Sequence, residues 1–246
     1  MAARLSRVLG VAASLAACGR VGFNSHAQLQ SDAPAGGDSG GSSTPTFVAT
    51  ARGGGSGAGV SLTIPQVTPG DLLVVGIVIW DATPVGSITD DTGGSLVSAN
   101  VRAASASTSS ELWYASPATS AGTRLDITMA GSASGYDLWA LEFANVATGA
   151  PAQTNTNCLQ YPPTVVTAPV TTTGARELVV NATMLQYPAY ADAVGGPFTA
   201  LPFLDGNVVA YTIADTPGSY APDISVGSGA GMAAMTCAST IAFVPR

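Results

Sequence analysis

The chain has 246 residues, a formal net charge of −7 and only 9% charged residues, and all 8 of its basic residues are Arg. These cations are scattered singly, which excludes a nucleic-acid-binding surface because phosphates require a basic patch. The low charge and the 29 Gly favour an exported β-protein, and the length allows one domain once a leader and a linker are set aside.

The first 17 residues contain the parts of a secretory signal. Arg4 and Arg7 precede an apolar run from Val8 to Ala17, and the run ends in small residues. It spans about ten residues, half of the roughly 20 that a membrane-spanning helix needs. We therefore expect residues 1–17 to be cleaved.

Leu15-Ala16-Ala17-Cys18 fits the bacterial lipobox, and the segment resembles a lipoprotein signal peptide. The resemblance implies that Cys18 is acylated on its sulfur and its new amino terminus, so the membrane becomes a partner through a lipid anchor. Gly19 replaces the Asp that marks retention at the inner membrane, so we expect the outer membrane of a Gram-negative bacterium, on its periplasmic or its surface-exposed face. The alternative is an ordinary signal peptide with a chance Cys near its cut.

Residues 18–45 carry the lipidated Cys18 and then a stretch rich in Ser, Gly, Asp and Pro. Such a stretch buries too little apolar surface to offset its ordering entropy, so we predict a disordered, flexible linker. His26 is the only histidine of the chain and lies here. We expect it to be solvated and to have no metal-binding or catalytic role.

Between residues 46 and 246, short apolar runs alternate with Gly, Pro and Asp, which predicts strands joined by turns. Val60–Ile64 alternates as a half-buried strand does, whereas Leu72–Trp80 is apolar on both faces and predicts a central strand. Arg124–Met129 and Tyr136–Phe143 extend the pattern. We predict an all-β fold, a two-sheet antiparallel β-sandwich of jelly-roll-like form.

The second half of this domain repeats the first in outline. Thr172–Val180 echoes Thr68–Val75, since each is a turn followed by a core strand. The period of roughly 100 residues is far longer than a solenoid unit. We expect two similar halves of one sandwich, joined by a crossover over Asn145–Pro169.

Several core strands and turns also resemble a jelly-roll or immunoglobulin-like β-sandwich module found in bacterial and phage surface proteins. The resemblance covers nearly all of residues 46–246 and implies a sandwich with no established activity. The residues that carry it are Gly70–Gly76, Ile88–Asp90, Leu112–Ala115, Leu141–Phe143 and Glu177–Val180.

Cys158 and Cys237 remain once Cys18 is assigned to lipid. Two cysteines in an oxidising compartment favour a disulfide. The alternative is that Cys237 is a small buried apolar residue, because it shares its strand face with Met235, Ile241 and Phe243.

We predict no catalytic residue and no cofactor. A Ser–His or Cys–His pair lacks its base because residues 46–246 contain no histidine. No Cys, His or carboxylate spacing fits a zinc site. Glu111, Glu142 and Glu177 stand alone on their strands, which excludes the Glu-x-Asp-x-Glu pattern of laminarinase-type hydrolases. Two distant Asp residues remain able to meet in space.

Two further motifs are more typical of turns than of sites. Gly53–Gly59 lacks the Lys of a P-loop and predicts a flexible hairpin or loop. Asp90 and Asp91 are a calcium candidate through their carboxylates, but an ordinary Asx turn is the favoured interpretation.

Aromatic residues are the remaining ligand-binding candidates, because their faces stack on the apolar faces of pyranose rings. The alternative for each is a place in the core or an incidental position on the surface. The candidates are Trp80, Trp113, Tyr187 and Tyr190.

The sequence leaves three functional hypotheses. The first is a non-enzymatic surface lipoprotein whose sandwich mediates adhesion or binds carbohydrate. The second is a passive structural component of the cell envelope with no ligand. The third is a glycan-active hydrolase, which requires two close carboxylates in a cleft.

Overall fold

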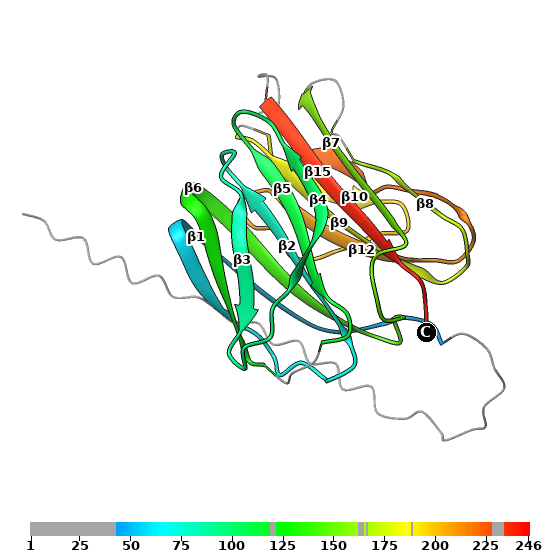
Figure 1. Cartoon of the computed structure of the whole chain (residues 1–246). Helices are drawn as coiled ribbons and strands as arrows, with labels where there is room; N and C mark the ends of the chain where they lie inside the picture. Colours follow the sequence, from blue (N-terminus) through cyan, green and yellow to red (C-terminus); the bar gives the residue numbers. More distant parts are fainter. Residues whose placement is uncertain (1–42, 119–121, 162–164, 166, 188, 228–233) are drawn as a thin grey trace, which may run out of the picture. The chain divides into compact units, whose positions relative to one another are not determined.

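The computed structural model describes residues 43–246, except 119–121, 162–164, 166, 188 and 228–233 (Figure 1). The expected signal peptide, Cys18, His26 and most of the expected linker lie outside the described residues. Within them, no helix is long and apolar enough to cross a membrane. The strands are β1 (Thr46–Thr63), β2 (Leu72–Ile79), β3 (Val85–Asp90), β4 (Val97–Ala104), β5 (Ser109–Ala115), β6 (Arg124–Ala144), β7 (Gln153–Tyr161), β8 (Val170–Thr172), β9 (Glu177–Leu185), β10 (Ala191–Gly195), β11 (Thr199–Ala200), β12 (Val208–Ala214), β13 (Gly218–Tyr220), β14 (Asp223–Val226) and β15 (Ala234–Phe243).

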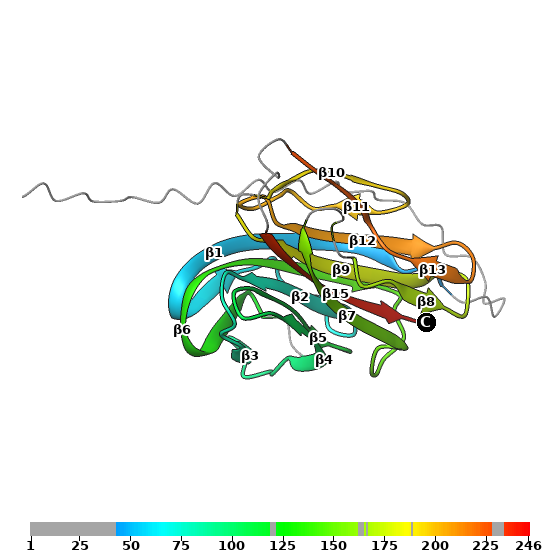
Figure 2. The same cartoon turned by 90° about the horizontal axis from the view of Figure 1, so that it is seen from above.

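Two antiparallel sheets face each other across an apolar core (Figures 1 and 2). The first has the order β1-β6-β2-β5-β4, with β3 also pairing with β6, and the second has the order β11-β12-β9-β15-β7. Side chains such as Val74 and Leu141 from the first sheet pack between the sheets with Val180 and Ile241 from the second. The predicted two-sheet antiparallel β-sandwich is confirmed.

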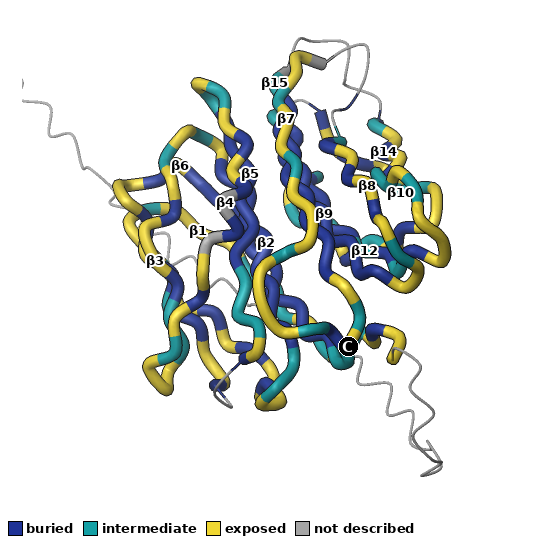
Figure 3. Tube along the Cα trace, turned by 45° about the vertical axis from the view of Figure 1, so that its right-hand side comes forward, coloured by how far each residue is buried: buried dark blue, intermediate teal, exposed yellow. Residues whose placement is uncertain are grey.

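Both sheets are also covered on their outer faces, which is why their central strands are buried along their whole length (Figure 3). The long strands β1 and β6 bend together (Figure 2), and with β3 they enclose a second core around Tyr136, Ile127 and Ile77. The outer face of the second sheet is covered by the small pairs β10–β14 and β8–β13. The prediction of a central strand at β2 is confirmed.

The glycine run Gly53–Gly59 is part of strand β1, so the prediction of a loop is wrong. The run lies where β1 bends, and the register with β6 shifts on both sides of Gly57, whose φ is +96°. At Gly59 a Cβ would lie 2.6 Å from the carbonyl oxygen of Ile127. Glycine therefore allows two strands to bend in close contact.

The two halves have the same topology. The order β1-β6-β2-β5-β4 in the first sheet corresponds to β7-β15-β9-β12-β11 in the second. Equivalent aromatic pairs also cross the core in opposite directions: Tyr114 contacts Phe243 at 5.5 Å between ring centroids, and Tyr211 contacts Phe143 at 5.2 Å. The repeat is confirmed, but Asn145–Pro169 is not a simple crossover, because it contains the edge strand β7.

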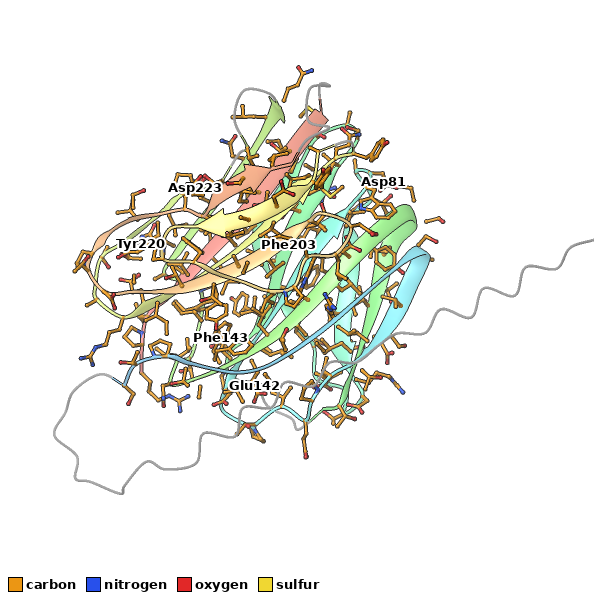
Figure 4. The ribbon with its side chains drawn as sticks, turned by 180° about the vertical axis from the view of Figure 1, so that it is seen from behind. Asp81, Glu142, Phe143, Phe203, Tyr220 and Asp223 are labelled. Atoms are coloured by element: carbon orange, nitrogen blue, oxygen red, sulfur yellow. A yellow bond between two sulfur atoms is a disulfide. The ribbon has the colours of Figure 1, made fainter. Side chains whose placement is uncertain are left out.

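The equivalent central strands β2 and β9 begin at the same end of the sandwich. Phe143 pairs with Leu72 at the start of β2, while Tyr211, which contacts Phe143, pairs with Val180 near the start of β9. The chain also enters at this end, where the Ser43 amide donates to the carbonyl oxygen of Arg246. We call the opposite end, where β2 and β9 finish, the distal end. In Figure 4, Asp81 marks the distal end, and Glu142 and Phe143 mark the entry end.

A disulfide joins Cys158 in β7 to Cys237 in β15, as predicted. The two residues are directly opposite in the strand register, with Cα atoms 4.2 Å apart. Cys237 is also fully buried. Cys237 therefore forms the predicted disulfide and is also buried, as the alternative interpretation expected.

Candidate functional site

Exposed aromatic side chains gather at the distal end. In the described part of the chain, the large aromatic residues with substantial exposure are Trp80, Tyr187 and Tyr190, at 41%, 89% and 39%. Trp80 directly follows β2, and both tyrosines follow β9. Because β2 and β9 are equivalent strands of the two halves, the structure brings three of the four predicted aromatics to one end.

Trp80 is held in place although it is exposed. Its ring lies against the backbone of Gly135, where a Cβ would be 2.1 Å from Trp80 Cε3. The Trp80 amide also donates to the Gly135 carbonyl oxygen at 2.9 Å. A side chain that is fixed before binding loses less entropy when it binds.

Asp81 anchors the loop that carries Trp80. Its carboxylate accepts hydrogen bonds from the amides of Thr83 at 2.8 Å and Ser134 at 2.7 Å. These hydrogen bonds outweigh the opposing effect of desolvation, the largest single contribution, and lower the pKa of Asp81 to about 2. The loop is thereby fastened to the bend of β6.

Tyr190 also rests on glycines. A Cβ on Gly206 would lie 2.3 Å from Tyr190 Cβ, and one on Gly227 would lie 2.3 Å from Tyr190 Cε2. The Ala191 amide donates to the Gly206 carbonyl oxygen at 2.8 Å, and the Gly227 amide donates to that of Tyr190 at 3.1 Å. Tyr187 projects further than either, as its exposure shows.

A buried polar pair lies between Trp80 and Tyr190. Asn207 donates from Nδ2 to Oδ2 of Asp137 at 2.8 Å, and its Oδ1 accepts from the Leu185 amide at 2.9 Å. Asp137 belongs to β6 in the first sheet and Leu185 to β9 in the second. The side chain of Asn207 therefore joins the two sheets at the distal end.

Burial raises the pKa of Asp137 to about 6. The nearby Asp205 carboxylate adds to the rise, and the hydrogen bond from Asn207 opposes it. Only 4% of Asp137 is exposed. Asp137 thus supports the site from beneath rather than contacting a ligand directly.

Trp113 does not belong to this surface. It is buried in the core enclosed by the bend of β1 and β6, and its Nε1 donates to Oε2 of Glu111 at 3.1 Å. The outer face of β5 would be open in a plain sandwich, but here the bent strands cover it. Trp113 is therefore no longer a candidate for ligand binding.

Asp90 and Asp91 form turn contacts near the entry end. One oxygen of Asp90 accepts from the amides of Thr92 and Gly94, and Asp91 accepts from the amide and hydroxyl of Thr123. The Thr123 hydrogen bonds lower the pKa of Asp91. The described residues contain no group of three or more Cys, His or carboxylate side chains placed to hold a metal ion. The geometry is that of the favoured Asx turn.

The three glutamates are buried and accept hydrogen bonds from other groups of the protein. Glu111 pairs with Arg102 Nε at 2.9 Å, Glu142 accepts from the Thr68 amide at 2.7 Å, and Glu177 accepts from the Gly174 amide at 2.6 Å. Asp71 lies beside Glu142, and burial together with the Glu142 carboxylate raises its pKa. Of these two carboxylates, Glu142 borders a crevice of about 10 Å³, which is too small for a sugar ring.

The sequence indicated that Asp137 is buried, but Asp137 was not predicted as a residue of the site. Asp137 has the same strand parity as Trp139, Leu141 and Phe143, which were expected on one face of the sheet. A carboxylate on that face had to be buried and paired. Nothing in the sequence points to Gly135, Gly206 or Gly227 as supports for aromatic rings, because those contacts join segments that are distant along the chain. No protein-family model and no curated protein matches this chain.

Proposed function

We propose that this chain is an exported lipoprotein, tethered to the outer membrane through Cys18, whose sandwich binds carbohydrate or another surface component without catalysis. The observation that carries the proposal is the exposure of Trp80, Tyr187 and Tyr190 at the distal end. Exposed aromatic residues held in fixed positions are typical of surfaces that bind sugar rings.

The position of the chain entry supports this proposal. Ser43 and Arg246 lie together at the end opposite to the aromatic residues. A tether that joins the domain at Ser43 leaves the distal end free for a ligand. The absence of catalysis is inferred from the lack of histidine in residues 46–246 and from the structural hydrogen bonds of the glutamates.

Glycan-array binding tests the binding function. We expect the wild-type domain to bind at least one glycan and the triple variant Trp80→Ala, Tyr187→Ala, Tyr190→Ala to lose that binding. Val97→Ala is the matched control, because Val97 is an exposed apolar residue that pairs with Tyr114 near the entry end. No binding to any glycan, with unchanged cell adhesion in a deletion strain, would favour a passive envelope component.

Detergent partitioning tests the anchor. We expect full-length protein to enter the detergent phase and Cys18→Ser protein to remain in the aqueous phase. Finding both forms in the aqueous phase would end the lipoprotein interpretation.

A further inference from the structure

The charges around the aromatic residues of the distal end are negative. Asp192 lies beside Tyr190, because both would contact a Cβ placed on Gly227, with Asp192 Oδ1 at 2.7 Å. Asp205 precedes Gly206, on which Tyr190 rests. Both carboxylates are exposed. A negatively charged ligand on Tyr190 would therefore be repelled.

The Arg side chains near this end already bond protein groups. Arg102 pairs with Glu111 and donates to the carbonyl oxygen of Ala82 in the loop after Trp80. Arg52 donates to the carbonyl oxygen of Phe203 at 3.4 Å. A carboxylate, sulfate or phosphate group on a ligand would have to compete with these bonds.

A series of neighbouring residues and contacts connects Trp80 to Tyr190. Trp80 rests on Gly135, which lies two residues from Asp137 on the same face of β6. Asp137 bonds Asn207, and the adjacent Gly206 supports Tyr190. Two exposed rings on equivalent loops of a repeated fold suit a ligand that itself presents repeated apolar faces.

We propose that the ligand of the distal end is a polysaccharide chain without negative charge that contacts Trp80 and Tyr190 at the same time. This inference rests on the proposed function. It adds two properties: the ligand carries no negative charge, and it is longer than a single sugar.

The test is retention of the domain on insoluble polysaccharides. Cellulose, chitin and β-1,3-glucan serve as uncharged probes, and calcium alginate gel serves as the anionic probe. We expect retention on at least one uncharged polymer, with little change as salt rises, since no ion pair is involved. Trp80→Ala and Tyr190→Ala should each weaken retention about 3- to 10-fold, while Val97→Ala should not. Soluble oligosaccharides of the bound polymer should compete far better than its monosaccharide.

A charge variant separates the two properties. Asp192→Asn with Asp205→Asn should increase retention on alginate and leave retention on the uncharged polymer unchanged. Wild-type retention on alginate alone, lost at high salt, would overturn the inference but keep the binding function. Equal competition by the monosaccharide would overturn the requirement for a chain. Failure of the wild type to bind any polymer or glycan would overturn the carbohydrate-binding function on which this inference rests.

Discussion

Asp137 is the residue where burial and charge conflict most directly. Its pKa is raised to about 6 in the folded protein, above the ordinary value of 3.8. The protonated form is therefore favoured by folding. The stabilising contribution of protonated Asp137 is fully present below about pH 3.8 and is lost as the pH rises through 6.

Asp137→Asn should therefore stabilise the protein at pH 7.5 and not at pH 4. Asparagine keeps an acceptor for Asn207 and carries no charge. The expected gain is on the order of 1 to 3 kcal/mol, because one pKa unit corresponds to about 1.4 kcal/mol. Urea unfolding at both pH values measures it. An equal effect at the two pH values would show that Asp137 does not titrate in this range.

At the scale of elements, the loop after β2 depends on one carboxylate. Asp81→Ala removes the acceptor of the Thr83 and Ser134 amides and should destabilise the protein by about 1 to 3 kcal/mol. Faster hydrogen exchange at these two amides measures the loosening of the loop. Asp126→Asn is the control, since Asp126 is a surface residue at the other end of β6 and should leave both amides unchanged.

The pH dependence of Asp81 has the opposite sign to that of Asp137. Its pKa is lowered to about 2, so its contribution to stability is complete above about pH 3.8 and is lost as the pH falls toward 2. Wild-type protein should lose more stability than Asp81→Asn over this range. Parallel curves for the two proteins would contradict the role of the carboxylate.

The disulfide ties the edge strand β7 to β15 and closes a loop between residues 79 positions apart. Replacing both Cys158 and Cys237 by Ala should cost roughly 4 kcal/mol in the chain-entropy account. Urea unfolding with and without reductant measures this. Reductant should lower the unfolding midpoint of the wild type and leave the double variant unchanged. Two alkylatable thiols in the non-reduced wild type would refute the bridge.

Strands could be predicted from the sequence where the apolar and polar pattern on both faces matches the burial that the structure shows. Leu72–Ile79 is apolar at every position but Gly76, and it is buried throughout. The prediction from the sequence was wrong where a bend in two paired strands covers a sheet face that a plain sandwich would leave exposed. The bend of β1 and β6 turns Gly53–Gly59 into a strand and buries Trp113, and local patterns do not encode that long-range pairing.

At the scale of the whole domain, the two halves share one core and should unfold together. Each half contributes one sheet, and the residues between the sheets come from both, as the crossed pairs Tyr114–Phe243 and Tyr211–Phe143 show. Separating the sheets would expose this core, whose burial contributes about 25 cal/mol per Å². Neither sheet is therefore expected to remain folded without the other.

The distribution of tryptophan allows a direct test of this coupling. Trp80, Trp113 and Trp139 all lie in the first half. Trp113 is buried in the core that the first half encloses alone, so its fluorescence reports on the first sheet. Trp139 lies between the sheets and donates from Nε1 to the carbonyl oxygen of Pro202, so its fluorescence responds to both sheets. Hydrogen exchange at the buried amides of β9 and β15 reports on the second sheet. We expect the free energy of opening at these amides to equal the global free energy of unfolding from fluorescence, as it does for a single cooperative unit. A second sheet that opened at lower free energy, while the fluorescence of Trp113 stayed native, would show that the repeated halves are two folding units.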